Sequence, residues 1–203
     1  MTHYLYRDDL PEAIDFGSAV AIDTEAMGLN PRRDRLCLLQ LSAGDGDAHL
    51  VQFAPGCYVA PQLKRLLADP RVTKLFHFAR FDLAMIYHYL GVMALPVYCT
   101  KIASRLARTF TDRHGLRDLC KDLINVDLSK QQQSSDWGAE TLTEEQLRYA
   151  ASDVLHLHAL RGRLDAILAR EGREGLAHAC FDFLPHRVRL DLDGWSEQDI
   201  FAH

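Results

Sequence analysis

Hydrophobic and polar positions along the first part of the chain follow the period of strands. Three apolar stretches, residues 19–25, 36–42 and 48–53, are rich in β-branched and aliphatic side chains. Turn-forming residues separate them, and the loop at residues 43–47 has the glycine and aspartate content of a hairpin. We therefore expect an antiparallel meander of three strands.

From residue 61 onward, the apolar spacing changes to that of helices alternating with short strands. Gly91 ends one predicted helix, and Thr143 with Gln146 fits a capping box at the start of the last one. The predicted helices cover residues 61–68, 81–90, 100–107, 116–124 and 143–170, and the predicted strands cover residues 72–78 and 97–99. This order favours an α/β fold, in which a mixed sheet of meander and parallel strands is flanked by helices.

Both ends of the chain lie outside this alternation. Residues 1–18 are polar and predict a short edge element and a small helix near residues 11–14. Residues 181–195 alternate apolar and polar side chains as a strand does. We expect a single domain over residues 1–180 and a C-terminal tail, residues 181–203. This tail is expected to dock on the domain or on a neighbouring subunit, because aromatic and arginine side chains are enriched at protein interfaces.

Composition is that of one compact globular domain. The 203 residues are 48% hydrophobic, and no apolar run approaches the ~20 residues that span a bilayer, so we expect no membrane partner. The N-terminus lacks the pattern of a signal peptide. Five scattered cysteines, never spaced as C-x-x-C, disfavour a disulfide framework and a thiolate zinc site and indicate the cytoplasm.

The net charge of −5 bears on possible nucleic-acid partners. Proteins that hold long nucleic acids by the backbone are usually basic, because phosphate neutralisation supplies most of the affinity. Any nucleic-acid substrate is therefore expected to be short or held locally.

Two acids, Asp23 and Glu25, end the first strand of the predicted meander. Side chains alternate along a strand, so both carboxylates point the same way and repel each other. A cation between them would remove that repulsion, and hard oxygen ligands suit Mg²⁺ or Mn²⁺. Taken alone, the pair is a weak signal, and two solvated acids at a strand end would be the favoured interpretation.

Two further acids stand where structural acids are less expected. Asp82 opens the helix that follows the predicted strand 72–78, where an acid also matches the helix dipole. Asp153 lies among apolar residues inside the last helix, and Tyr149 shares its helix face four residues earlier. As a lone pair, Tyr149 and Asp153 would be core packing with a hydrogen bond.

Taken together, these motifs carry a family resemblance. D-x-E on a first strand, H-x-x-x-x-D at a strand-to-helix junction and Y-x-x-x-D on a late helix resemble the DEDD superfamily of 3′→5′ exonucleases. The tyrosine marks the DEDDy branch, since the sister branch would have a histidine where this chain has Arg148. Matches to the ribonuclease D group extend over Phe76–Leu83 and Lys130–Val154, and the resemblance covers about residues 20 to 170.

This resemblance implies a ribonuclease H-like fold and a two-cation site. The four acids Asp23, Glu25, Asp82 and Asp153 would hold two divalent cations, Mg²⁺ or Mn²⁺, and Tyr149 would orient the attacking water. The implied products are nucleoside 5′-monophosphates.

The resemblance also implies which residues contact the substrate. Leu29 would act as a wedge between the last two bases, His77 would bind the sugar or phosphate, and Trp137 would stack on a base or close the pocket. The sequence alone leaves three alternatives: an ordinary loop leucine, a hydrogen-bonded histidine at a strand end and a tryptophan anchored in the core. The full set of implied substrate contacts is Thr24, Met27, Gly28, Leu29, His77, Phe81, Lys130, Gln133 and Trp137.

One departure from ribonuclease D narrows the range of expected substrates. Ribonuclease D carries helical nucleic-acid-binding domains after its catalytic domain, and we expect none here. The chain resembles instead the short ribonuclease D-like proteins called nano-RNase C, which implies short single-stranded RNA down to dinucleotides as substrate and a homo-oligomer, a ring-shaped octamer. Two alternatives stay open: a general 3′→5′ exonuclease on longer RNA or single-stranded DNA, and a non-catalytic exonuclease-like scaffold.

Overall fold

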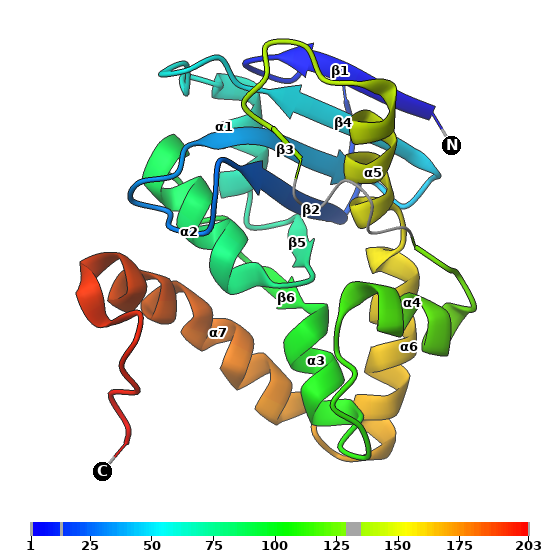
Figure 1. Ribbon diagram of the computed structural model, residues 1–203. Coiled ribbons are helices and arrows are strands. Elements are labelled where there is room, and N and C mark those ends of the chain that lie inside the picture. The colour runs from blue at the N-terminus through cyan, green and yellow to red at the C-terminus, as the bar shows by residue number, and fades with distance from the viewer. Residues whose placement is uncertain (1, 13, 129–134, 203) are drawn as a thin grey trace.

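The structure is a computed structural model that describes residues 2–12, 14–128 and 135–202. In these residues six strands form one mixed sheet with the order β1-β4-β3-β2-β5-β6 (Figure 1). The pairs β2–β3 and β3–β4 are antiparallel, and β1–β4, β2–β5 and β5–β6 are parallel. The strands are β1 (Thr2–Arg7), β2 (Ala19–Ala26), β3 (Leu36–Ser42), β4 (Asp47–Gln52), β5 (Thr73–Phe76) and β6 (Val97–Cys99). This sheet confirms the predicted fold class and its three-strand meander.

The described residues form seven α-helices, most of them where the sequence predicted helices. They are α1 (Pro61–Ala68), α2 (Ala79–Leu90), α3 (Thr100–Ala107), α4 (Leu116–Ile124), α5 (Glu144–Leu155), α6 (Leu157–Arg170) and α7 (Glu174–Leu190). The prediction is confirmed to the residue for α1, α3 and α4. Gly91 ends α2 in the left-handed conformation, at a φ of 70° that a glycine adopts without strain.

The N-terminal segment differs in part from the prediction. Its edge element is confirmed as β1, but the described residues near 11–14 form a turn and no helix. The segment instead places the Asp9 carboxylate at the start of α1, where it accepts hydrogen bonds from the backbone N–H groups of Gln62 (3.0 Å) and Leu63 (2.9 Å). Asp9 thus satisfies two donors that the first turn of a helix leaves unpaired.

The single long helix predicted over residues 143–170 is wrong, because a turn at His156 divides it into α5 and α6. The predicted capping box at Thr143 and Gln146 is present at the start of α5. Near the break, the Ser152 hydroxyl donates to the Tyr149 carbonyl (2.7 Å), a local bond that competes with the helical ladder. The two helices also have different main neighbours: α5 packs on β2, β3 and β4, whereas α6 packs chiefly on α3 and α4.

The strand pattern expected of residues 181–195 is wrong as well. These residues form the second half of α7 and a π-helical turn that follows it (Asp191–Trp195). The expected boundary after residue 180 therefore lies inside a helix. Phe181, Leu184 and Val188 are buried at helical spacing, and α7 contacts α2, α3, α6 and β6.

The end of α7 is tied to the start of α2. The Arg80 guanidinium donates two hydrogen bonds to the Asp191 carboxylate (2.5 and 2.7 Å), and Arg187 donates to the same carboxylate (2.7 Å). We call this contact the Arg80–Asp191 clasp. It fixes the first turn of α2, which also carries Asp82.

Strand lengths explain where the acids lie. β5 pairs with β2 only over Ala19–Ala21, so the part of β2 that carries Asp23 and Glu25 extends past the end of β5. The first turn of α2 follows β5 beside this free edge, and α5 covers β2, β3 and β4 (Figure 1).

Among the described helices, none has both the length and the apolar character needed to cross a bilayer.

Candidate active site

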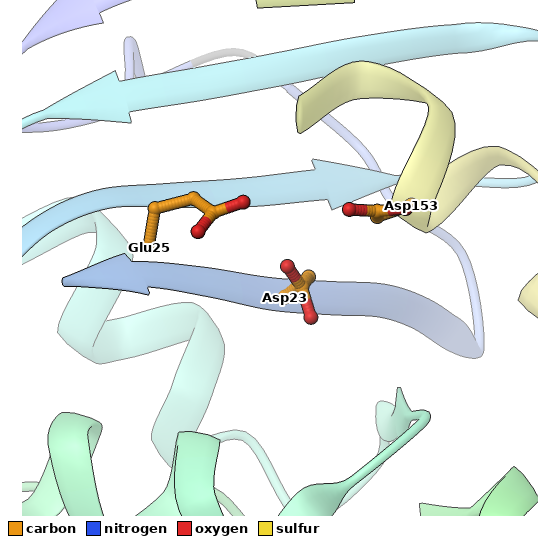
Figure 2. Close-up of side chains that lie close together, drawn as sticks. All are labelled: Asp23, Glu25 and Asp153. Atoms are coloured by element: carbon orange, nitrogen blue, oxygen red, sulfur yellow. The ribbon is translucent and has the colours of Figure 1, made fainter. Parts of the chain in front are cut away.

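Three carboxylates from two elements converge at the free end of β2. Asp23 and Glu25 point from the same face of β2, and Asp153 comes from α5 above it (Figure 2). One oxygen from each lies within 4.8 Å of the others. Three hard oxygen donors at this spacing match the ligands that Mg²⁺ and Mn²⁺ prefer.

Asp82 lines the same cleft of 340 Å³ from the first turn of α2. It is buried, and its carboxylate accepts a hydrogen bond from the Thr24 hydroxyl (2.7 Å). Thr24 lies between the two acids of β2 and points the other way along the strand. The Thr24 hydroxyl therefore positions Asp82, and Thr24 lines the cleft together with the acids.

The acids share one electrostatic environment. Burial raises the pKa values of Asp23, Glu25, Asp82 and Asp153 above the ordinary carboxyl range. The charge of Asp23 raises the pKa of each of the other three further. Several acids held this close in a low-dielectric cleft favour a bound cation, because it offsets their repulsion.

Tyr149 joins the cleft from α5, one turn before Asp153. Burial, and then the charges of Asp153 and Glu25, raise the pKa of its phenol. The hydroxyl therefore keeps its proton at neutral pH and can donate a hydrogen bond. Trp137 packs beside it with ring centroids 6.1 Å apart and is 3% exposed, so it is anchored in the core.

The loop after β2 carries the implied wedge. Leu29 is 86% exposed and, with Phe81, lines a groove of 450 Å³ that adjoins the acidic cleft. Gly28 lies against the Asp34 side chain, where a Cβ atom would collide with the carboxylate. Asp34 in turn accepts from the Asn30 backbone (3.0 Å), so Gly28 is required by the packing of the loop.

His77 lines the cleft at the end of β5, and its Nδ1 lies 2.9 Å from the Thr100 hydroxyl. Burial, and then the nearby charge of Lys101, lower the pKa of His77 to about 3, so the ring is neutral at physiological pH. Met27 is half-exposed and lies against Gly138. Lys130 and Gln133 lie outside the described residues.

The structure also brings residues to the cleft that sequence reasoning missed. Lys101 lines it at the start of α3, with Nζ 4.4 Å from the ring centroid of Phe78, which is 47% exposed. Lys101 forms no ion pair with any residue in the described part of the chain. The sequence feature that could have pointed to Lys101 was its position just after the strand β6. Only the parallel pairing of β5 with β6, however, shows that this strand end lies beside the acids.

Comparisons with known proteins agree with this geometry. The 3′-5′ exonuclease family profile matches residues 7–169. The structure of Brucella melitensis NrnC is 57% identical, with a TM-score of 0.97 over 100% of this chain and 98% of that one, and NrnC has also been solved with bound Mg²⁺ and bound to pGG. Escherichia coli RNase D is 26% identical, with a TM-score of 0.74 over 84% of this chain and 45% of that one.

Ribonuclease D of Gluconacetobacter diazotrophicus is 38% identical over 154 residues, which are 76% of this chain. The chain spans only 39% of the length of that relative. The family match covers most of the chain, and the likeness to NrnC covers both chains almost completely. The chain therefore belongs to the 3′-5′ exonuclease family, in the ribonuclease D-like group of DEDD enzymes close to NrnC.

Proposed function

We propose that this protein is a metal-dependent 3′→5′ exoribonuclease that hydrolyses short RNA, down to dinucleotides, to nucleoside 5′-monophosphates. The observation that carries the proposal is the convergence of Asp23, Glu25 and Asp153 within 4.8 Å in a cleft that Asp82 also lines. Further support comes from the likeness to NrnC, which has been solved bound to pGG.

The acids fit two divalent cations, Mg²⁺ or Mn²⁺. All four side chains offer hard carboxylate oxygens, and burial leaves them few other means of balancing their charge. The chemistry that such cations supply is activation of a water nucleophile and neutralisation of charge on the leaving oxygen. In this assignment the four acids are the metal ligands.

The remaining residues bind and orient. Tyr149 donates a hydrogen bond to the attacking water and holds it in line with the terminal phosphodiester, since its raised pKa makes it a poor base. Leu29 and Phe81 contact the 3′-terminal bases from the adjoining groove, and His77 contacts the sugar. We also assign substrate contact to Met27 and Gly28 in the loop, and to Lys130 and Gln133. The buried Trp137 packs against Tyr149 and is assigned no substrate contact.

Among the basic side chains of the described residues, Lys101 is the best placed to bind a substrate phosphate. Lys101→Met is therefore expected to raise KM about tenfold with little change in kcat. The reason is the loss of a charge-assisted hydrogen bond, which contributes roughly 1.5–3 kcal/mol, or at least a factor of ten. Steady-state kinetics on a labelled dinucleotide measures the effect. Lys64→Met, on α1 outside the cleft, is the matched control, and an unchanged KM in Lys101→Met would remove Lys101 from the binding site.

A time course with 5′-labelled RNAs tests the function itself. Lengths should run from a dinucleotide to an oligomer that extends well beyond the cleft, with Mg²⁺, with Mn²⁺ and with EDTA. The expected result is metal-dependent cleavage with a strong preference for the dinucleotide. Similar rates on all lengths would favour a general 3′→5′ exonuclease on longer RNA or single-stranded DNA. The absence of cleavage with either metal would favour a non-catalytic scaffold.

We further propose that the protein acts in the cytoplasm as a homo-oligomer, a ring-shaped octamer. Its five cysteines are unpaired, as is usual in a reducing compartment. Phe78, Phe183 and Phe201 are 47%, 37% and 71% exposed and line one pocket, and exposed large apolar side chains mark interaction surfaces when they cluster. Light scattering on the full chain is expected to give the mass of an octamer, and a monomer mass would contradict this part of the proposal.

A further inference from the structure

The side-chain carboxamide of Gln40, on β3, is buried but contributes no hydrogen bond to the fold among the described residues. Its side chain is 0% exposed, and neither its Oε1 nor its Nε2 has a hydrogen-bond partner among the described residues. Leaving a buried polar group unpaired costs about 1–3 kcal/mol, so such groups are rare in native folds. A buried, unpaired amide is explained if it gains a hydrogen-bond partner in another state of the protein.

The sheet register puts Gln40 beside the acids. Gln40 is the direct antiparallel partner of Asp23, and directly opposed residues point to the same face with Cβ atoms about 4.5–5.5 Å apart. α5, which carries Asp153, contacts both β2 and β3. The Gln40 amide therefore lies on the acidic face, within side-chain reach of the Asp23 carboxylate.

Its neighbours on that face show that this is not a general polar surface. Leu38, opposite Glu25, is apolar, and the hydroxyl of Ser42, opposite Ala21, donates to the Asp47 carbonyl (2.7 Å). Gln52 on β4 is also buried, but its Nε2 donates to the Ala139 carbonyl (2.9 Å).

We propose that Gln40 is a positioning residue for the metal ligand Asp23, whose carboxylate accepts a hydrogen bond from the Gln40 Nε2 when a divalent cation is bound. This inference rests on the metal-dependent function proposed above. An ionised carboxylate only accepts hydrogen bonds, and a carboxamide offers two donors on one nitrogen. Such a bond fixes the direction in which the remaining Asp23 oxygen points, and partners of this kind tune metal affinity.

Gln40→Met tests the inference because it keeps the length and unbranched shape of the side chain and removes the amide. Titration calorimetry with Mn²⁺ alone, on the full chain without RNA, is expected to show a Kd about 10–100-fold weaker than that of the wild type. The melting temperature of the metal-free protein is expected to stay equal or rise, because an unpaired buried amide is gone. The Mn²⁺ concentration for half-maximal hydrolysis should rise with the Kd, while KM for RNA at saturating Mn²⁺ stays the same.

A purely structural role gives the opposite pattern. If Gln40 only fills space, Gln40→Met would leave the Kd for Mn²⁺ unchanged, and that result overturns the inference. Gln62→Met, on α1, is the matched control and should alter neither the Kd nor hydrolysis. If Gln40→Met does not fold, Gln40→Asn carries the test: it shortens the reach of the amide, so it should weaken Mn²⁺ binding, and wild-type affinity would contradict the proposal.

The wild type separates this inference from the proposed function. Wild-type cleavage together with unchanged Mn²⁺ affinity in Gln40→Met overturns the role of Gln40 alone. Wild-type Mn²⁺ binding without cleavage of any RNA overturns the proposed function alone. A wild type that binds no Mn²⁺ overturns both.

Discussion

Asp23→Asn is expected to abolish RNA hydrolysis while making the metal-free protein more resistant to heat. Asp23 converges with Glu25 and Asp153, and its charge raises the pKa of the three other acids. An amide in its place removes an anionic ligand, so we expect kcat/KM to fall at least about 10³-fold, which is roughly 4 kcal/mol of transition-state stabilisation. Asp153→Asn is expected to behave in the same way.

The stability effect has a defined sign. Because the folded-state pKa of each acid is raised, the folded protein holds protons that the unfolded chain releases, so the cluster destabilises the metal-free fold increasingly as pH rises above about 4. Removing one acid relieves that penalty. At alkaline pH in EDTA, the melting temperature of Asp23→Asn should exceed that of the wild type. The expected difference is about 2–4 °C for each kcal/mol of destabilising free energy that the substitution removes.

Calorimetric melting curves in EDTA, together with hydrolysis assays in Mg²⁺, measure both effects of this variant. Asp112→Asn is the matched control, because Asp112 is exposed and lies outside the cleft. Wild-type hydrolysis by Asp23→Asn would show that Asp23 is not a metal ligand. A lower melting temperature without metal would show that its carboxylate stabilises the fold by itself.

Tyr149→Phe is expected to lower kcat about 10²-fold while KM for a dinucleotide stays within error. The phenol lies beside Asp153 and keeps its proton, so its loss removes the hydrogen bond that aligns the water, and misalignment of this kind costs about 10²-fold. The ring remains, and with it the packing against Trp137.

Single-turnover hydrolysis and equilibrium binding of RNA separate the two quantities for Tyr149→Phe. Tyr4→Phe, at an exposed position on the edge strand β1, controls for loss of a phenol elsewhere. Unchanged turnover would remove Tyr149 from the mechanism, and a pH optimum that shifts in the variant would indicate that the phenol transfers a proton after all.

Local signals were sufficient to predict most helices. Gly91 and the Thr143 capping box mark helix ends by chemistry that acts within one turn, and both are confirmed. The C-terminal segment was ambiguous, because its apolar residues fit two periods. Alternation suggests a strand, whereas Phe181, Leu184 and Val188 also lie three and four residues apart, and burial against the domain selects the helix.

The acids were predicted for a different reason. Strand alternation alone places Asp23 and Glu25 on one face, and a family resemblance points to Asp82 and Asp153. The Thr24–Asp82 hydrogen bond, Lys101 at the cleft and Gln40 opposite Asp23 depend on strand pairing and register between distant segments. No local pattern encodes that register, so these residues became visible only in the folded structure.

The Arg80–Asp191 clasp has a consequence for synthesis on the ribosome. Its two residues are 111 positions apart, and Arg80 stands two residues before Asp82. At about 5–20 residues per second, Asp191 follows Arg80 out of the peptidyl-transferase centre by roughly 5–20 s. A nascent chain that has already formed its whole sheet therefore still lacks the contact that fixes the first turn of α2, and nuclease activity should arise only after Asp191 has left the ribosome.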